Sequence, residues 1–325
     1  MKTIKNENII ELDIRQHSID RVKDIFIFAI GYEGRSIAIL KEYFSDSHTT
    51  RLGFVFDDYK KYPEAKENYK FVTNMGLKPI KKKYDEYLEV LSAVEEQLIY
   101  AKNDFEKVNI HIDYSSMPRS WYCNLAINIK KLLRDKDRAY FWYSEGDYQQ
   151  KSETWPNAGI EKFTVFNGNV SLRPTNNRSH ILGLGFDRNR AHAICSVLDP
   201  SYLVVTYSYV QDDQKMRNDL KRCNRQINNL AAYSVTLPVD NFEFSISKLY
   251  ETVKELHPKG DVILVPDGPK TQILAASLMP DFFPEFGVVC LHVKRHRDSY
   301  EAINVEPTGK VFGFSYGKDG FGSSQ

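Results

Sequence analysis

The 325-residue sequence lacks the features that would mark a secreted or membrane protein. Its first residues, MKTIKNENIIELDIRQHSID, contain no apolar core of a signal peptide, and no stretch reaches the roughly 18–20 apolar residues of a membrane span. Cysteine is scarce. The four cysteines stand apart with no C-x-x-C pair, so we expect reduced thiols rather than disulfides or a zinc site. These absences predict a cytoplasmic protein with no membrane contact.

An excess of charge is also missing. The 44 Lys and Arg residues balance 43 Asp and Glu residues, which gives a formal net charge of +1. A chain without a basic field shows no extended surface for nucleic acid, although a local basic pocket remains open. The sequence contains no Walker A motif, no G-x-G-x-x-G and no serine-hydrolase elbow. What is present is an ordinary globular composition, 42% hydrophobic and 27% charged, in a chain long enough for two domains.

Short apolar runs alternate with longer amphipathic segments through the first half of the chain. The run IFIFAI, for example, is rich in β-branched and aromatic residues and ends at Gly31, which is typical of a buried strand. The predicted strands are 25–30, 51–58, 78–84, 108–115 and 139–145, and the predicted helices between them are 35–44, 64–76, 86–102 and 119–133. Strands that alternate with helices of this length form right-handed βαβ units and a parallel sheet.

The same order of elements returns after residue 180. The predicted strands are 180–187, 201–210, 232–239, 261–269 and 286–295, and the predicted helices are 188–198, 214–229, 244–257 and 270–280. Gly31 and Asp113 lie 82 positions apart, as do Gly185 and Asp267. We therefore predict an α/β fold of two tandem Rossmann-like domains, each a doubly wound, mostly parallel sheet, related by internal duplication. The alternative is one long sheet whose βα turns merely look alike.

Composition places the boundary between the two predicted domains. Residues 149–179 are rich in Asn, Ser, Gly and Pro, which predicts a linker in which KFTVF and VSLRP form a hairpin across NGN. The first domain is then 1–148. The second is 180–325, and we expect its Gly/Ser-rich tail to be mobile.

Unusual polar turns follow the first and fourth predicted strands of each half. In the first half these are GYEGRS at 31–36 and DYSSMPR at 113–119, and in the second they are GFDRNR at 185–190 and DGPKTQ at 267–272. In a doubly wound sheet the carboxyl ends of strands 1 and 4 flank the switch point, where ligands bind. We therefore expect each pair of turns to face one another across a crevice.

The residues in these turns suit an anionic or nucleotide-like ligand. Small residues let backbone N–H groups approach a phosphate, helix N-termini add their dipoles, and Arg or Lys adds positive charge. The predicted ligand-binding residues are Gly31, Tyr32, Arg35, Ser115, Ser116 and Arg119 in the first half, and Gly185, Asp187, Arg188, Arg190, Asp267, Gly268, Lys270 and Thr271 in the second. Ordinary roles stay open: the serines as helix caps, the glycines as tight turns, and the arginine and tyrosine of GYEGRS as surface charge and packing residue.

Carboxylates gather at the predicted strand ends of the first half more densely than in the second. If this half is catalytic, Glu33 and Asp113 are the acid/base pair or metal ligands of a metal-assisted hydrolase acting on a nucleotide phosphoester or glycosidic bond. Asp57 and Asp58 are then candidate ligands for Mg²⁺, a cofactor that the sequence suggests without requiring it. The alternative is that the segment DDYKKYPE, residues 57–64, is a solvated loop.

The turn DYSSMPR resembles the strand 4 turn of the CRISPR-associated Rossmann-fold (CARF) sensor domains, an Asn/Asp-x-Ser/Thr-x-x-Arg/Lys pattern, with one extra residue before Arg119. DGPKTQ is a poorer match, because Lys270 comes early and no hydroxyl precedes Thr271. Two copies on one chain are also similar to the SAVED sensor arrangement. The resemblance implies a nucleotide or short oligonucleotide sensor of antiviral defence. The acidic first half departs from the pattern, and with no nuclease or protease domain appended we expect an effector protein or a homo-oligomer as partner.

Overall fold

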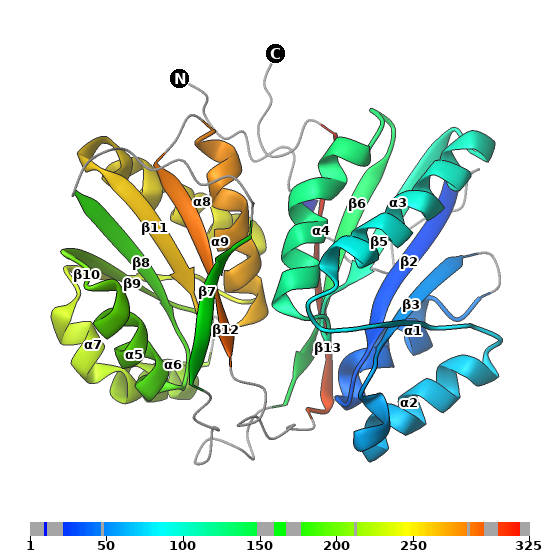
Figure 1. Cartoon of the computed structure of the whole chain (residues 1–325), viewed down its shortest axis with the longest axis horizontal. Coiled ribbons are helices and arrows are strands. Elements are labelled where there is room, and N and C mark those ends of the chain that lie inside the picture. The colour runs from blue at the N-terminus through cyan, green and yellow to red at the C-terminus, as the bar shows by residue number, and fades with distance from the viewer. Residues whose placement is uncertain are drawn as a thin grey trace. The chain divides into compact units, whose positions relative to one another are not determined.

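The structure is a computed structural model, and it describes residues 10–11, 22–46, 49–147, 159–166, 177–210, 213–284, 287–295 and 305–318. The chain forms two compact units. Unit 1 comprises Met1–Gln150 together with Ala302–Gln325, and unit 2 comprises Lys151–Glu301. Each unit is an α/β structure built around its own sheet (Figure 1).

The described sheet of unit 1 has seven strands in the order β1-β13-β6-β5-β2-β3-β4 (Figure 1). Its centre is parallel: β3 and β5 flank β2, β4 extends β3, and β6 extends β5. β13 pairs antiparallel with β6, and β1 pairs antiparallel with β13. The bounds are β1 Ile10–Glu11, β2 Val22–Ile30, β3 Thr50–Phe56, β4 Ile80–Lys82, β5 Lys107–Asp113, β6 Arg138–Gly146 and β13 Pro307–Tyr316.

Helices cover the two faces of this sheet. On one face, α1 and α2 contribute Ile39, Leu40, Ala65 and Val72 to a buried cluster that includes Phe26 of β2. On the other face, α3 packs against α4. The bounds are α1 Ala38–Tyr43, α2 Pro63–Asn74, α3 Tyr87–Asp104 and α4 Arg119–Leu132, with 3₁₀ turns at Gly34–Ile37 and Tyr59–Lys61 before α1 and α2.

The described sheet of unit 2 has six strands in the order β10-β9-β8-β11-β12-β7. All neighbours are parallel except β12 and β7. The strands are β7 Ile160–Val165, β8 Arg178–Leu184, β9 Tyr202–Tyr207, β10 Tyr233–Thr236, β11 Asp261–Pro266 and β12 Val288–Arg295. The helices are α5 Arg188–Leu198, α6 Gln214–Cys223, α7 Arg225–Leu230, α8 Phe242–Leu256 and α9 Lys270–Phe282. α5, α6 and α7 cover one face, and α8 and α9 lie together on the other (Figure 1).

The two sheets share one strand order. β4-β3-β2-β5-β6-β13 in unit 1 corresponds to β10-β9-β8-β11-β12-β7 in unit 2, with an antiparallel strand beside the fifth parallel strand in each. The prediction of two tandem, doubly wound, mostly parallel α/β domains is therefore confirmed. The alternative of a single continuous sheet is wrong. Within the described ranges, no helix has the length and hydropathy needed to cross a bilayer.

The division of the chain differs from the predicted boundaries at 148 and 180. The segment Pro307–Tyr316, assigned to the second domain, forms β13 in the sheet of unit 1. The segment Ile160–Val165, assigned to the linker, forms β7 in the sheet of unit 2. Strand KFTVF is thus present, but it pairs with β12. The proposed hairpin partner VSLRP and the Gly/Ser tail from 319 onward lie outside the described residues.

Burial on both faces explains the continuous apolar runs. Ile25 to Ile30 of β2 are each at most 1% exposed. A strand at the centre of a parallel sheet is covered by helices on both sides, so apolar residues follow one another without alternation. The same rule makes the central strands easy to find in the sequence, and it places their carboxyl ends at one edge of each sheet.

Candidate functional site

The turn after β2 meets the turn after β5 in unit 1. A Cβ atom added to Gly31 would lie 3.3 Å from Ser116 Cβ, so a larger residue would crowd this approach. β2 and β5 are parallel neighbours, which places both of their carboxyl ends at the same edge of the sheet. The structure thus brings together the two polar turns that the sequence predicted to face one another.

Arg35 is buried inside this meeting point, at 2% exposure. Its Nε donates to Glu33 Oε2 at 2.6 Å, and its Nη1 donates to Tyr143 OH at 2.9 Å and to Ser144 O at 3.2 Å. The guanidinium carbon lies 5.3 Å from the centre of the Tyr143 ring. Ser116 Oγ donates to the same Glu33 oxygen at 3.4 Å. Arg35 therefore ties the β2 turn to the end of β6, and its charge is paired inside the protein.

Asp113 and Ser115 are bound to the backbone of unit 1. Asp113 Oδ1 accepts the N–H of Ser115 at 2.9 Å, and Ser115 Oγ accepts the N–H of Ser144 at 2.8 Å. Both side chains are buried, at 2% and 0% exposure. Glu33 has a separate partner in Arg35. The role of Glu33 and Asp113 as an acid/base pair therefore stays a prediction of the sequence.

The turns after β8 and β11 meet in the same way in unit 2. A Cβ atom added to Gly185 would lie 3.1 Å from Asp267 O. Arg190, 5% exposed, forms ion pairs with Asp187, at 2.7 Å, and with Asp267. Asp187 also caps α5, because its Oδ1 accepts the N–H of Arg190 at 3.0 Å. In both units, therefore, a buried arginine paired with carboxylate lies where the two turns meet.

Two asparagines that the sequence analysis did not single out support these turns. Asn68 Nδ2, from α2, donates to Gly31 O at 3.1 Å. Asn224 Nδ2, at the end of α6, donates to Gly185 O at 2.8 Å. The two asparagines follow their glycines by 37 and 39 residues. Both side chains hold the carbonyl of the first-strand glycine. Their similar spacing from that glycine in the two halves is the sequence signal that could have identified them.

The helices that follow β5 and β11 begin alike. The N-cap of α4 is Pro118, with φ −61° and ψ 150°, and the N-cap of α9 is Pro269, with φ −61° and ψ 158°. Neither helix has a capping side chain, and the first helical residues are Arg119 and Lys270. The alternative that Ser115 or Ser116 caps α4 is therefore wrong, and structurally Arg119 corresponds to Lys270.

Three other helices of unit 2 have side-chain caps. Asp187 caps α5, Asp213 caps α6 and Asn241 caps α8, each by accepting a backbone N–H of the first turn. A cap satisfies one of the N–H groups that a helix leaves without a partner at its start. α1, α2, α3 and α7 also lack such a cap, so what α4 and α9 share is the combination of a proline N-cap with a cation as the first helical residue.

Buried polar atoms lie beside the N-terminus of α9. Gln272 is 2% exposed, its Nε2 donates to Thr206 Oγ1 at 2.6 Å, and its Oε1 fills the space beside Gly268. Within the described part of the chain, neither Gln272 Oε1 nor Thr271 Oγ1 has a hydrogen-bond partner. Buried polar atoms are usually satisfied, so an unpaired pair at a strand–helix turn points to a ligand or water. The sequence analysis included Thr271 but missed Gln272.

The remaining predicted residues lie around the turns. Tyr32 packs on Tyr62, with ring centres 5.2 Å apart, and Arg188 is exposed. Asp57 is exposed and Asp58 half-buried. Among the residues described, no three His, Cys, Asp or Glu side chains form a group that could hold a metal. Mg²⁺ at these two aspartates stays a prediction of the sequence alone.

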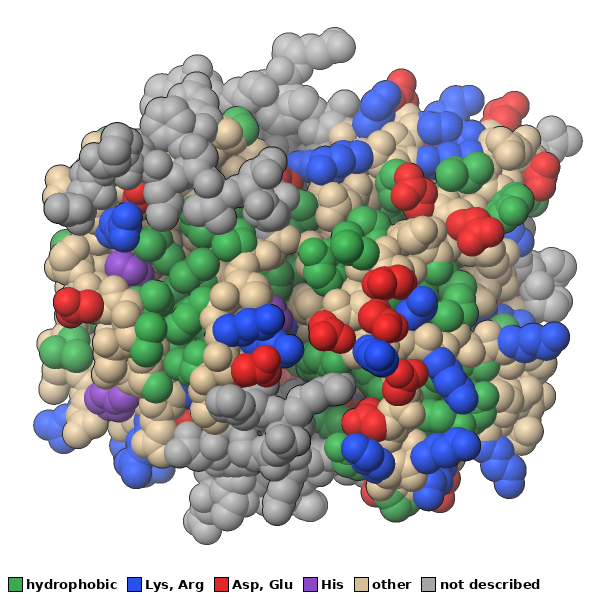
Figure 2. Space-filling model, viewed as in Figure 1, with side chains coloured by type: hydrophobic (Ala, Val, Ile, Leu, Met, Phe, Trp, Pro, Cys, Tyr) green, Lys and Arg blue, Asp and Glu red, His purple; other side chains and the backbone are tan. Residues whose placement is uncertain are grey.

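The charge on the visible face is mixed in sign. Figure 2 shows acidic and basic side chains interspersed over unit 1, on the right, with no large field of one sign. This distribution agrees with the formal net charge of +1.

No protein-family model matches the sequence, and no curated protein matches it. Among solved structures, the chain is similar to a type III CRISPR defence DNA nuclease activated by cyclic oligoadenylate, with a TM-score of 0.45 and 6% identity, over 79% of this chain. The match covers 64% of the nuclease chain, so this chain spans less than two thirds of its length.

Two further structures are more distant. UDP-GlcNAc 2-epimerase from Neisseria meningitidis has a TM-score of 0.20 and 10% identity, over 80% of this chain and 90% of that one. A ketoreductase domain from the bacillaene assembly line has a TM-score of 0.20 and 9% identity, over 86% of this chain and 70% of that one. All three TM-scores lie below 0.5, and they add nothing to the functional evidence in the chain's own residues.

Proposed function

We propose that the chain is a nucleotide- or short oligonucleotide-binding regulatory protein, whose ligand phosphates bind at the N-termini of α4 and α9. The observation that carries the proposal is the shared start of these helices: a proline N-cap, no capping side chain, and Arg119 or Lys270 as the first helical residue. The N–H groups of a first helical turn and the positive end of the helix dipole attract anions. Following the CARF resemblance, the proposed role is that of a sensor in antiviral defence acting on an effector protein.

The groups beside α9 extend the proposed site in unit 2. The hydroxyl of Thr271 can donate to a phosphate oxygen, and Gln272 Oε1 can accept from a base amino group or a ribose hydroxyl. A ligand held there would satisfy both buried atoms. Gly268 places no side chain in the turn, and the space that a Cβ atom would take is occupied by Gln272 Oε1.

In this proposal the two buried arginines position the turns. Arg35 is paired with Glu33, and Arg190 with Asp187 and Asp267, so neither carries an uncompensated charge. Their ion pairs hold the first-strand turn in place at each crevice. The cations proposed to meet phosphate are Arg119 and Lys270, at the start of α4 and α9.

The test is a binding titration by calorimetry against mononucleotides, dinucleotides and short cyclic and linear oligoadenylates. We expect Arg119→Ala and Lys270→Ala each to weaken binding. A charge-assisted hydrogen bond contributes roughly 1.5–3 kcal/mol, which corresponds to about tenfold or more in affinity. The matched control is Lys215→Ala, because Lys215 is an exposed cation in the first turn of α6, whose N-terminus Asp213 already caps.

Two results would overturn the proposal. One is unchanged affinity in both variants with the fold retained, and the other is no binding of any nucleotide in the panel. Product formation during the titration, checked by chromatography with and without Mg²⁺, would instead favour the hydrolase alternative. Loss of that product in Glu33→Gln or Asp113→Asn would then identify the acidic pair as its source.

A further inference from the structure

The edge strands of the two sheets differ in charge. β4 of unit 1 carries Lys81 and Lys82, and β7 of unit 2 carries Glu161 and Lys162. Charged side chains on an edge strand keep it from pairing with another chain. β10 is the other edge of the unit 2 sheet, and its sequence, YSVT, contains no charged residue. Of these three edges, β10 is the one without this protection.

The open side of β10 presents backbone hydrogen-bonding groups. Among the described strands, β10 pairs with β9 alone. The N–H of Ala232 donates to Leu203 O at 2.8 Å. Because successive residues of a strand direct their N–H and C=O groups to opposite sides, those of Tyr233 and Val235 point away from β9. A further strand could pair with these groups.

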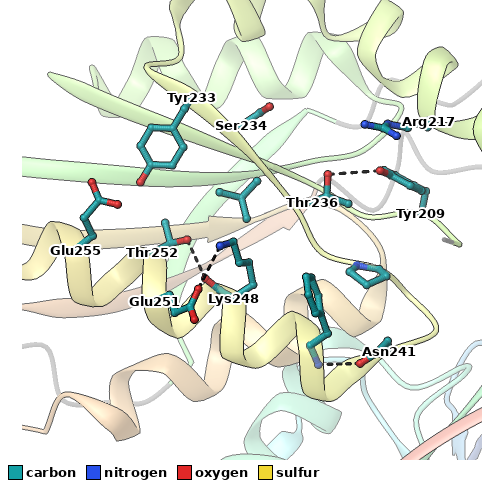
Figure 3. A pocket seen from close by; sticks show the side chains of 13 residues that line it. Tyr209, Arg217, Tyr233, Ser234, Thr236, Asn241, Lys248, Glu251, Thr252 and Glu255 are labelled. Carbon is teal, nitrogen blue, oxygen red and sulfur yellow. Dashed lines mark hydrogen bonds and ion pairs between the residues drawn. The ribbon is translucent and has the colours of Figure 1, made fainter. Parts of the chain in front are cut away.

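A groove of about 870 Å³ runs along this open side (Figure 3). β10 and α8 line it, and Arg217 of α6 lies over the ring of Tyr209, 5.7 Å from its centre. Ser234 at the middle of β10 is exposed, and Phe244 on α8 is 51% exposed. The groove therefore gives an incoming strand access to the edge of the sheet.

α8 presents a stripe of one aromatic and three charged side chains to this groove. Phe244, Lys248, Glu251 and Glu255 all line it, at the spacing that puts residues on one face of a helix. Lys248 Nζ and Glu251 Oε2 form an ion pair at 3.2 Å (Figure 3). The stripe runs from an exposed aromatic through a cation to two carboxylates. If α8 of a second copy lies antiparallel to this stripe, Lys248 of each copy is directed toward Glu251 and Glu255 of the other.

We propose that two copies of this chain associate through β10, in antiparallel pairing about a twofold axis at Ser234. Tyr233 of each copy then lies opposite Val235 of the other, in the arrangement in which facing residues exchange both of their backbone hydrogen bonds. The contact covers two unprotected edges at once. A second copy also supplies the complement of the α8 stripe, which is why the groove fits this chain better than an unrelated strand.

The test is sedimentation velocity of the full chain over a wide range of protein concentration. We expect a reversible dimer. Ser234→Lys gives β10 a lysine like those of β4 and places two like charges at the axis, so the dissociation constant should rise at least about tenfold. Ser234→Thr is the matched neutral control and should leave the dimer intact. Lys81→Glu, on the lysine-rich edge of unit 1, is the control for a change of net charge.

A charge swap distinguishes the twofold contact from a general effect on folding. Lys248→Glu should weaken the dimer, because each copy then brings three carboxylates to the axis and no cation. Adding Glu251→Lys to it exchanges the signs and should restore the dimer. Circular dichroism confirms that each variant folds. A single-chain mass at every concentration, or a dimer indifferent to both Ser234→Lys and Lys248→Glu, would overturn the proposal and leave the groove to a partner of another kind.

Discussion

The two units hold their first-strand turns in the same way, by a buried arginine paired with carboxylate. In unit 1, Arg35 pairs with Glu33 and also donates to Tyr143 OH and Ser144 O. In unit 2, Arg190 meets two carboxylates, those of Asp187 and Asp267. A buried arginine at the first-strand turn is common to both units, whereas its printed partners differ. In the proposed function this arginine positions the turn, and the ligand meets the groups at the starts of α4 and α9.

The turns that lead into α4 and α9 differ more. In unit 1 four residues, 114–117, lie between Asp113 and Pro118, and the hydroxyl of Ser115 accepts the N–H of Ser144 on β6. In unit 2 only Gly268 lies between Asp267 and the proline N-cap. Buried polar side-chain atoms without a hydrogen-bond partner among the described residues lie beside both turns: Ser144 Oγ in unit 1, and Thr271 Oγ1 and Gln272 Oε1 in unit 2.

The largest expected effect comes from removing the two arginines. Arg190→Met leaves two buried carboxylates without a cation, so we expect a loss of about 3–5 kcal/mol of stability. Arg35→Met leaves the Glu33 carboxylate, which is 15% exposed, without this cation, and the greater exposure should make the loss smaller, about 2–3 kcal/mol. Urea unfolding measures the loss, and hydrogen exchange assigns it to a unit. Arg222→Met, which breaks an exposed pair, is the control. Equal losses in the two units would contradict the difference drawn between them.

We expect replacement of either supporting asparagine to cost less stability than loss of the arginines, and to cost a similar amount in the two units. Asn68→Ala removes the amide donor of the buried Gly31 carbonyl, and Asn224→Ala that of the half-buried Gly185 carbonyl, each at a cost of about 1–3 kcal/mol. Both variants should also raise hydrogen exchange in the turn that follows the first strand of their unit. Asn74→Ala, at the exposed end of α2, should change stability by less than about 0.5 kcal/mol. A loss in one unit alone would break the correspondence.

The smallest expected effect is on the pH dependence of stability. Burial lowers the pKa of His111 in unit 1, and its contact with Asp24 opposes this shift in part. Burial, and then Arg178, lowers the pKa of His180 in unit 2. Because each folded-state pKa lies below the unfolded value of about 6.5, stability is fully present above that pH and falls as the pH drops below it.

Urea unfolding between about pH 7 and pH 5 measures this slope. His111→Gln and His180→Gln should each flatten it, and His192→Gln, at a half-buried position on α5, serves as the comparison. The buried ring of His111 accepts the indole N–H of Trp142 at 3.1 Å, so its loss should be felt in unit 1 alone. A stability that rises toward acid pH would show that the direction of these shifts is wrong.

The sequence predicted most of the fold because its central strands are buried on both faces. The apolar run at 25–30 predicts a buried strand, and it lies within β2. The edge strands β7 and β13 were misassigned because their pairing with β12 and β6 depends on contacts far along the chain. Local composition cannot show which sheet such a strand joins.

The candidate site was predicted in position but not in chemistry. The switch-point rule located all four turns, and the structure brings them together in pairs. The sequence could not show that Arg35 and Arg190 would be paired internally, because a carboxylate two or three residues away looks equally like a second ligand group. Asn68 and Asn224 look like surface positions on helices until the glycine carbonyls that they hold are known.

The most direct test of the central claim is to locate a bound nucleotide on the chain. Irradiation with 8-azido-ATP, followed by digestion and mass spectrometry, identifies the peptides within reach of the base. The account predicts crosslinks in the turns that lead into α4 and α9, at 113–119 and 267–272, and their loss in the presence of excess unmodified ATP. It predicts weaker labelling in Arg119→Ala and Lys270→Ala. Competable crosslinks confined to other parts of the chain, such as the groove beside β10, would contradict it.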